Sequence, residues 1–243
     1  MRTFARMTGA LASIPNAQPD TTRLTSEGDI ILFEDPFFGG GEAIYARAAG
    51  TIAPLEPVVF TPVFDSTEGR YVYAATTVPN TASLGKAAAV YMGGASIASG
   101  QYGLFQITGL TPVACNASVA ANTVVGIAAA GRLGAWATTK GVANCICAAA
   151  ATTTVVKKNS YIQNAGFQIR VTNSDGWFVG MPLTGTGVGA SAKILSISND
   201  GKIVTVDVAS TASGNVDVTG TYNNGTIYWN VIHMNRSFYQ GAA

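Results

Sequence analysis

The sequence predicts an all-β protein, because its apolar residues fall in short runs of strand length. β-Branched and aromatic residues dominate these runs, and Gly, Pro and Asn separate them. Turn-forming residues recur about every 8 to 15 positions, which is the spacing of a small sandwich or barrel. Two alternating runs on either side of Asn199-Asp200-Gly201 predict a β-hairpin over residues 192–208.

Residues 1–40 predict an extended N-terminal arm, since they show no regular hydrophobic period and contain three prolines. A turn and one short strand are expected within it at residues 26–33. The arm ends with Phe37 and Phe38, directly before three glycines. Two adjacent phenylalanine rings are unfavourable in water, so both are expected to dock on another surface. Phe37 and Phe38 are therefore the candidate interface residues.

Residues 41–158 predict a β-rich domain with the form of a small barrel or sandwich. Its apolar runs are bounded by turn-forming residues. The alanines at 148–151 do not favour a helix, because the threonines and valines that follow them favour a strand. The expected strands lie at residues 58–64, 70–74, 88–92, 103–108 and 122–127.

Residues 160–243 predict a second small β-sandwich module. Residues 167–172 alternate between apolar and polar positions, and the residues at 173–176 are typical of a turn. The hairpin at 192–208 lies in the middle of this module. A last strand is expected at residues 228–232.

The composition combines many apolar residues with few charges. Apolar residues make up 48% of the 243 positions and charged residues only 11%. The longest apolar stretch, at 114–137, is interrupted by Asn, Gly and Arg, so no membrane span is predicted. The net charge is +1 and the basic residues are scattered, which argues against direct nucleic-acid binding. So few charges favour a protein whose surface is covered in an assembly.

No motif in the chain predicts a catalytic, cofactor or metal site. Residues 185–190 match a Gly-x-Gly-x-x-Ala phosphate loop, but strand-like residues follow where that loop needs a helix. The single histidine, His233, lies between two apolar residues and is expected to be structural. Cys115, Cys145 and Cys147 are an odd number, so buried thiols are expected instead of a disulfide framework.

A glycosidase site needs a pair of carboxylates that meet in space. Most carboxylates of this chain adjoin Gly or Pro or lie in expected turns, where Asp is favoured by local backbone hydrogen bonds. Turn and surface roles are therefore predicted for them. The residues are Glu34, Asp35, Glu42, Glu56, Asp65, Glu68, Asp175 and Asp200.

Two stretches carry a resemblance to known proteins. The sequence GQYGLFQITGLTPV at 100–113, with the Val- and Ala-rich runs at 120–125 and 130–134, resembles the head decoration, or cement, proteins of tailed bacteriophages. This resemblance covers about residues 41–158. The sequence VGMPLTGTGV at 179–188 is similar to a small β module found in phage virion proteins and some bacterial surface proteins.

The resemblance implies a non-enzymatic structural virion protein without a cofactor. Such a protein binds the outer surface of an icosahedral capsid as a homotrimer and stabilises contacts between major capsid protein subunits. Its partners are then the major capsid protein and further copies of itself, with no nucleic acid and no membrane. The arm is expected to reach the capsid or a neighbouring copy.

Three other functions remain open at this point. A tail, baseplate or fibre protein of a phage would have the same β modules in fewer copies per particle. A bacterial surface or adhesion module would need an export signal, and none is recognised. A polysaccharide depolymerase would need a cleft with paired carboxylates.

Overall fold

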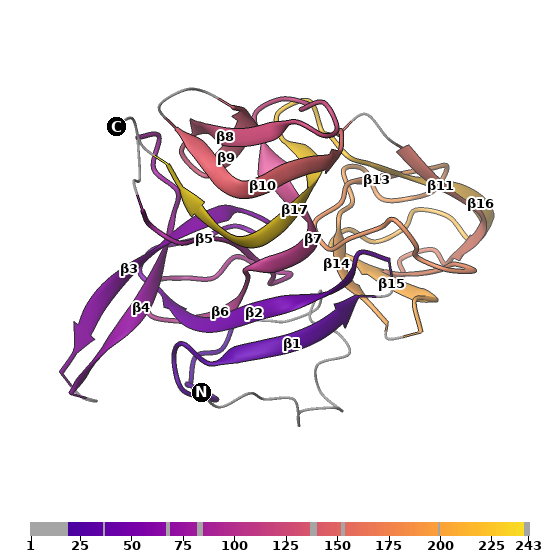
Figure 1. Cartoon of the computed structure of the whole chain (residues 1–243). Helices are drawn as coiled ribbons and strands as arrows, with labels where there is room; N and C mark the ends of the chain where they lie inside the picture. Colours follow the sequence, from indigo (N-terminus) through magenta and orange to yellow (C-terminus); the bar gives the residue numbers. More distant parts are fainter. Residues whose placement is uncertain are drawn as a thin grey trace.

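The structure, a computed structural model, consists of β-strands in three units (Figure 1). It describes residues 19–35, 37–66, 69–81, 85–136, 140–151, 154–198 and 200–240. These residues contain no α-helix, and their strands form a curled sheet, a closed barrel and a separate sheet. The all-β prediction is confirmed.

The N-terminal sheet is six-stranded and curls back on itself. Its order is β1-β2-β4-β3-β5-β6, and β2 also pairs with β6. Alternate side chains point inward from these strands, where Phe60, Tyr91 and Phe105 are buried against one another. The strands are β1 (Ile30–Asp35), β2 (Gly39–Ala48), β3 (Pro57–Asp65), β4 (Arg70–Thr77), β5 (Ala88–Tyr91) and β6 (Tyr102–Gln106).

The barrel contains five strands in the order β10-β17-β7-β9-β8. All three cysteines lie in its core as free, buried thiols. Val59, Ala88 and Val90 of the N-terminal sheet belong to the same core, so the sheet and the barrel form one body. The strands are β7 (Thr108–Cys115), β8 (Val124–Ala129), β9 (Arg132–Ala135), β10 (Gly141–Ala149) and β17 (Tyr228–Tyr239).

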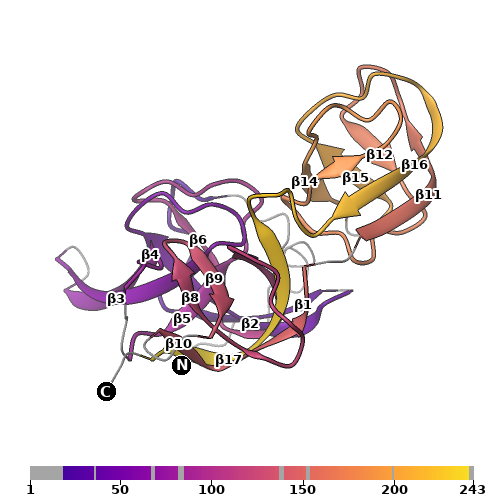
Figure 2. The ribbon, with the colours of Figure 1, turned by 90° about the horizontal axis from the view of Figure 1, so that it is seen from above.

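The third unit stands apart from this body when the molecule is seen from above (Figure 2). Its sheet order is β13-β16-β11-β12-β15-β14. The predicted hairpin is confirmed, since β14 and β15 pair antiparallel with Ile194 opposite Val206. The strands are β11 (Thr154–Ile162), β12 (Gln168–Arg170), β13 (Leu183–Thr184), β14 (Ile194–Ile197), β15 (Ile203–Val206) and β16 (Gly214–Thr221).

This unit, hereafter the inserted module, interrupts the barrel between β10 and β17. The sequence predicted one module over residues 160–243, but the structure places β17 in the barrel, where it pairs with β7 and β10. The two ends of the insertion meet, because Asn223 Nδ2 donates a 3.2 Å hydrogen bond to Ala151 O. The residue pattern of a strand predicts that the strand forms but not which strands it pairs with. The sequence of β17 therefore does not indicate that it pairs with the barrel strands.

The expected arm over residues 1–40 divides into three parts. Residues 1–18 lie outside the described residues. Residues 19–29 contact the sheet, where Asp20 pairs with Tyr102, and a turn at 26–29 is present as expected. Residues 30–35 form β1 and residues 39–40 begin β2, so this part belongs to the N-terminal sheet.

Candidate functional site

The turn between β1 and β2 positions the two candidate phenylalanines. Asp35 Oδ1 accepts hydrogen bonds from the backbone N–H groups of Phe37 at 2.8 Å and Phe38 at 2.7 Å. A short Asp side chain favours this arrangement, because its carboxylate reaches the backbone two and three residues further on. The turn therefore holds both rings in defined positions.

The two rings have different surroundings. Phe38 is 8% exposed and belongs to the core cluster of the inserted module, together with Trp177 and Phe178. Phe37 is 51% exposed and packs edge-on against Phe38, with ring centroids 4.9 Å apart. The structure thus places Phe38 on another unit of the same chain and leaves half of Phe37 open to solvent.

A cleft of about 200 Å³ lies beside Phe37, where the body meets the inserted module. We call it the junction cleft. Its walls include residues of the β1–β2 turn and the beginning of β7, together with residues 173–175, 198, 200 and 201 of the inserted module. Phe33, Phe38, Leu55 and Phe178 supply much of its apolar lining. Clefts between units of a fold are common binding sites.

Among the described residues that line the junction cleft, the charged side chains are all carboxylates. Asp35, Asp175 and Asp200, which the sequence assigned to turns, come together here. Hydrogen bonds from the Ser198 hydroxyl and the Lys202 backbone N–H lower the pKa of Asp200, so it is a carboxylate at neutral pH.

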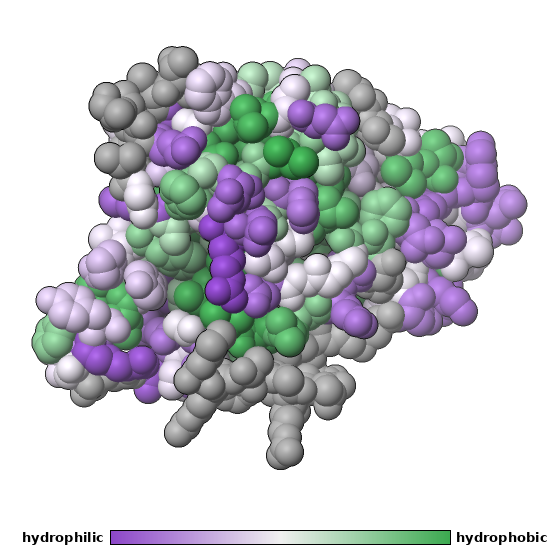
Figure 3. Space-filling view, viewed as in Figure 1, coloured by the Kyte–Doolittle hydropathy of each residue, from purple (hydrophilic) through white to green (hydrophobic). Residues whose placement is uncertain are grey.

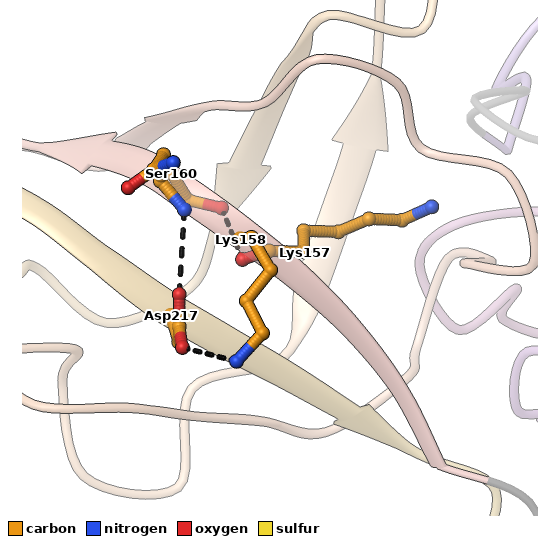
Figure 4. A network of polar contacts seen from close by, with 5 residues as sticks. Lys157, Lys158, Ser160 and Asp217 are labelled. Carbon is orange, nitrogen blue, oxygen red and sulfur yellow. Dashed lines mark hydrogen bonds and ion pairs between the residues drawn. The ribbon is translucent and has the colours of Figure 1, made fainter.

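The basic pair beside this site does not form a cationic patch. Figure 4 shows that Lys157 and Lys158 point in different directions. Lys158 Nζ lies 2.5 Å from Asp217 Oδ2. Lys157 Nζ donates to Asn173 Oδ1 at 2.8 Å and to the Asp175 backbone oxygen at 2.7 Å. Both ammonium groups are therefore engaged within the module.

A second candidate surface is the outer part of the β3–β4 hairpin, residues 61–65 and 70–73. We call it the projecting ribbon, because β3 and β4 extend beyond the rest of the sheet at the lower left of Figure 1. Beyond Val59 the register pairs β3 only with β4, and β4 meets β2 only at Ala74 and Ala75. The ribbon is thus two strands wide.

One face of the projecting ribbon is aromatic and exposed. Pro62 lies opposite Tyr73 and Phe64 opposite Tyr71, so all four side chains share one face. Tyr71 is 73% exposed and Phe64 is 55% exposed, and their ring centroids are 5.4 Å apart. The sequence predicted both strands, but it contained no sign that this face is left uncovered.

The opposite side of the ribbon differs, because Val72 is buried there. Arg47 of β2 lies 3.8 Å from Asp65, which ends β3 at the hairpin turn. Glu27 is buried in the same region, and no described residue forms a hydrogen bond with its carboxylate. Burial raises the pKa of Glu27, nearby Arg47 opposes this effect, and Asp65 adds to it. The aromatic face of the ribbon is therefore open, whereas the opposite face is covered at Val72 and exposed at Val63.

The outer side of the barrel is a further apolar area. Val124 of β8 lies opposite Ile146 of β10, and both are exposed. Figure 3 shows hydrophobic residues gathered over this part of the molecule. His233 is exposed on β17 next to it, in register with Ile146.

The described parts of the chain contain no group of three or more His, Cys, Asp or Glu side chains placed to hold a metal ion. They also contain no helix with the length and hydrophobicity needed to cross a membrane. No family model, curated protein or solved structure matches this chain. The surfaces described above are therefore the basis for assigning a function.

Proposed function

We propose that this chain is a non-enzymatic structural protein of a tailed-phage virion. It binds the outer surface of the icosahedral capsid as a homotrimer and stabilises contacts between major capsid protein subunits. The observation that carries the proposal is the exposed aromatic face of the projecting ribbon, formed by Pro62, Phe64, Tyr71 and Tyr73.

Burial of this face against another protein is favourable for two reasons. Tyrosine and phenylalanine rings are enriched at the centres of protein interfaces, where they bury large areas with little loss of side-chain freedom. A two-stranded ribbon is also only marginally stable in water, so a covering partner stabilises its fold. Both effects favour a partner that packs on the ribbon.

The partner contacts the face of the ribbon in this proposal, and does not extend its sheet. Pro62 lies in the middle of β3 and has no backbone N–H to donate to an added strand. Proline on an edge strand is a common protection against edge-to-edge pairing. A face-on contact leaves that protection in place while burying the aromatic rings.

The choice of a virion surface comes from the sequence. The resemblance of residues 41–158 to head decoration proteins points to the capsid. The low content of charged residues, 11%, is in keeping with a surface that is largely buried in an assembly, because interface centres are depleted in charge. The apolar outer side of the barrel offers further area for contacts between copies.

The decisive experiment measures binding to capsid shells of the phage that encodes the chain, after the native protein has been stripped from them. The double variant Phe64→Ser/Tyr71→Ser is expected to lose binding by about tenfold or more, because two exposed anchors are removed. The matched control is Phe167→Ser, since Phe167 is 52% exposed on the inserted module. Equal binding by the double variant and the wild type contradicts the proposal.

Copy number and mass test the remaining parts of the proposal. Quantitative mass spectrometry of purified virions is expected to find this chain at a level comparable with the major capsid protein. A few copies per particle indicate a tail, baseplate or fibre protein instead. Light scattering is expected to give three times the chain mass of 24.9 kDa. In thermal unfolding, the Tm is expected to fall when the protein is diluted, because dilution favours dissociation of the trimer. A monodisperse monomer contradicts the trimer.

A further inference from the structure

We infer that the junction cleft binds residues 1–18 of a neighbouring copy of this chain. The inference rests on the proposed function, in which several copies stand side by side on one surface. It assigns an occupant to the cleft and a binding site to the N-terminal segment.

The shape and lining of the cleft suit an apolar side chain from an extended segment. Phe33, Phe38 and Leu55 are nearly buried and are held by the body and the module, so this lining is preformed. Phe37 stands beside it with half of its ring exposed. A ring in this position can cover a side chain that enters the cleft, and such aromatic contacts contribute strongly to binding.

The charges of the cleft select a basic occupant. Its lining carries three carboxylates, Asp35, Asp175 and Asp200, and no described lining residue is basic. Lys157 beside the cleft offsets part of this charge, and a net excess of negative charge remains. Residues 1–18 contain Arg2 and Arg6 but neither Asp nor Glu. Opposite charges on the two surfaces favour their association and disfavour acidic competitors.

The same segment also carries apolar side chains next to its arginines. Phe4 lies between Arg2 and Arg6, and Met7 follows directly. Guanidinium groups also stack on aromatic rings, which places Arg2 or Arg6 favourably against Phe37. The alternation of basic and apolar residues therefore matches a cleft whose lining is apolar and whose charged groups are acidic.

The length of the segment allows it to reach another copy. Asp20, just after the segment, is hydrogen-bonded to Tyr102, which lies opposite Arg47 near the end of β2. The cleft is at the other end of β2, about 33 Å away for a strand of ten residues. Eighteen residues span at most about 60 Å. The contour length of the segment therefore exceeds the distance between its attachment point at Asp20 and the cleft of the same copy.

Binding is tested with a fluorescein-labelled peptide of residues 1–18. The receptor is the full chain with Arg2→Glu/Arg6→Glu, so that its own N-terminal segment does not compete. Saturable binding is expected, weakened by about tenfold or more when Phe37→Ala or Asp175→Asn is added. Phe167→Ala is the matched control and is expected to bind as the receptor does, because Phe167 is equally exposed but lies away from the cleft. Absent binding, or equal binding by all receptors, overturns the inference.

Exchange between copies is tested by sedimentation velocity of the full chain at several concentrations. Association is expected to weaken by about tenfold in Arg2→Glu/Arg6→Glu and, separately, in Asp175→Lys. When both changes are combined, the charges on the two surfaces are opposite again, so part of the association is expected to return. If the peptide binds but association is unchanged in these variants, the segment occupies the cleft of its own chain, which overturns the exchange between copies.

The inference and the proposed function fail in different ways. When Phe64→Ser/Tyr71→Ser is added to the receptor with Arg2→Glu/Arg6→Glu, its affinity for the peptide is expected to stay the same. Peptide binding without shell binding therefore refutes the capsid role alone. Shell binding without peptide binding refutes the role of the cleft alone.

Discussion

The side-chain oxygen of Asn230 accepts a 2.9 Å hydrogen bond from the backbone N–H of Ala151, which joins the last strand to the point where the chain leaves the barrel. The same oxygen accepts from Val119 N–H at 2.9 Å, and Asn230 Nδ2 donates to Ala117 O at 3.0 Å. Asn230 is completely buried. One side chain thus connects three segments that are distant in sequence.

Replacement of Asn230 with Ala is therefore expected to lower the free energy of unfolding by about 3 kcal/mol, because two buried N–H groups and one carbonyl lose their partner. Urea unfolding monitored by tryptophan fluorescence measures this. Asn235→Ala is the control, since Asn235 is exposed on the same strand. A loss similar to that of the control contradicts the assigned network.

Replacement of Gly41 by a larger residue is expected to destabilise the protein. An added Cβ atom would meet the backbone oxygen of Thr108 and would lie 2.9 Å from Phe33 Cζ. We expect Gly41→Ala to cost about 2 kcal/mol of stability, because the backbone must move to relieve the overlap. Gly50→Ala is the matched control, since nothing lies within 4 Å of its added Cβ. Thermal unfolding of both variants gives the comparison, and equal Tm values would show that β1, β2 and β7 are not packed as described.

The pH dependence of stability is expected to contain a contribution from Glu27. Burial raises the pKa of this carboxyl above its ordinary value of 4.5. The positive charges of Arg47, Arg23 and Arg70 lower the pKa, and the negative charge of Asp65 raises it further. In the pH range above 4.5 the folded state then binds more protons than the unfolded state, so the contribution of Glu27 is lost as the pH rises through its folded pKa.

Glu27→Gln removes this contribution. The free energy of unfolding of the variant, relative to the wild type, is expected to be larger at about pH 7 than at about pH 4. Glu34→Gln provides the control, because Glu34 is exposed on β1. Urea unfolding at both pH values measures the difference. A constant difference between Glu27→Gln and the wild type contradicts a raised pKa of Glu27 in the folded state.

The three cysteines are expected to be unreactive in the folded protein. Burial raises the pKa of Cys115 to about 11 and that of Cys145 to about 12, and it also raises the pKa of Cys147. Little thiolate is then present at about pH 8, and the thiolate is the reactive form. Mass spectrometry after iodoacetamide treatment is expected to find no modification in buffer and three modifications in urea. Rapid modification in buffer would show that the barrel core is open.

Local patterns predicted many of the strands and turns. The alternating residues on either side of position 199 form β14 and β15, and the aromatic runs at 58–64 and 70–74 form most of β3 and β4. These elements depend on side-chain shape and on neighbouring turn residues, which are properties of a short stretch of sequence. The thiols at 115, 145 and 147 were likewise expected to be buried, because nothing in their spacing indicated another role.

The candidate site was only partly visible in the sequence. Phe37 and Phe38 are adjacent rings that need a surface, but the core cluster that buries Phe38 includes Trp177 and Phe178, about 140 residues further along the chain. The carboxylates of Asp35, Asp175 and Asp200 were each assigned to a turn. Only the docking of the module on the body brings these three turns around one cleft.

The sequence by itself determined the all-β class, the turn chemistry and the low charge, because these follow from residue type and short-range spacing. The tertiary structure alone decided that β17 returns to the barrel, that the module is an insertion, and that the face around Tyr71 is left open while Val72 is covered. The physical reason is that strand pairing and burial depend on contacts between distant segments, whose free energy is not encoded in any one of them.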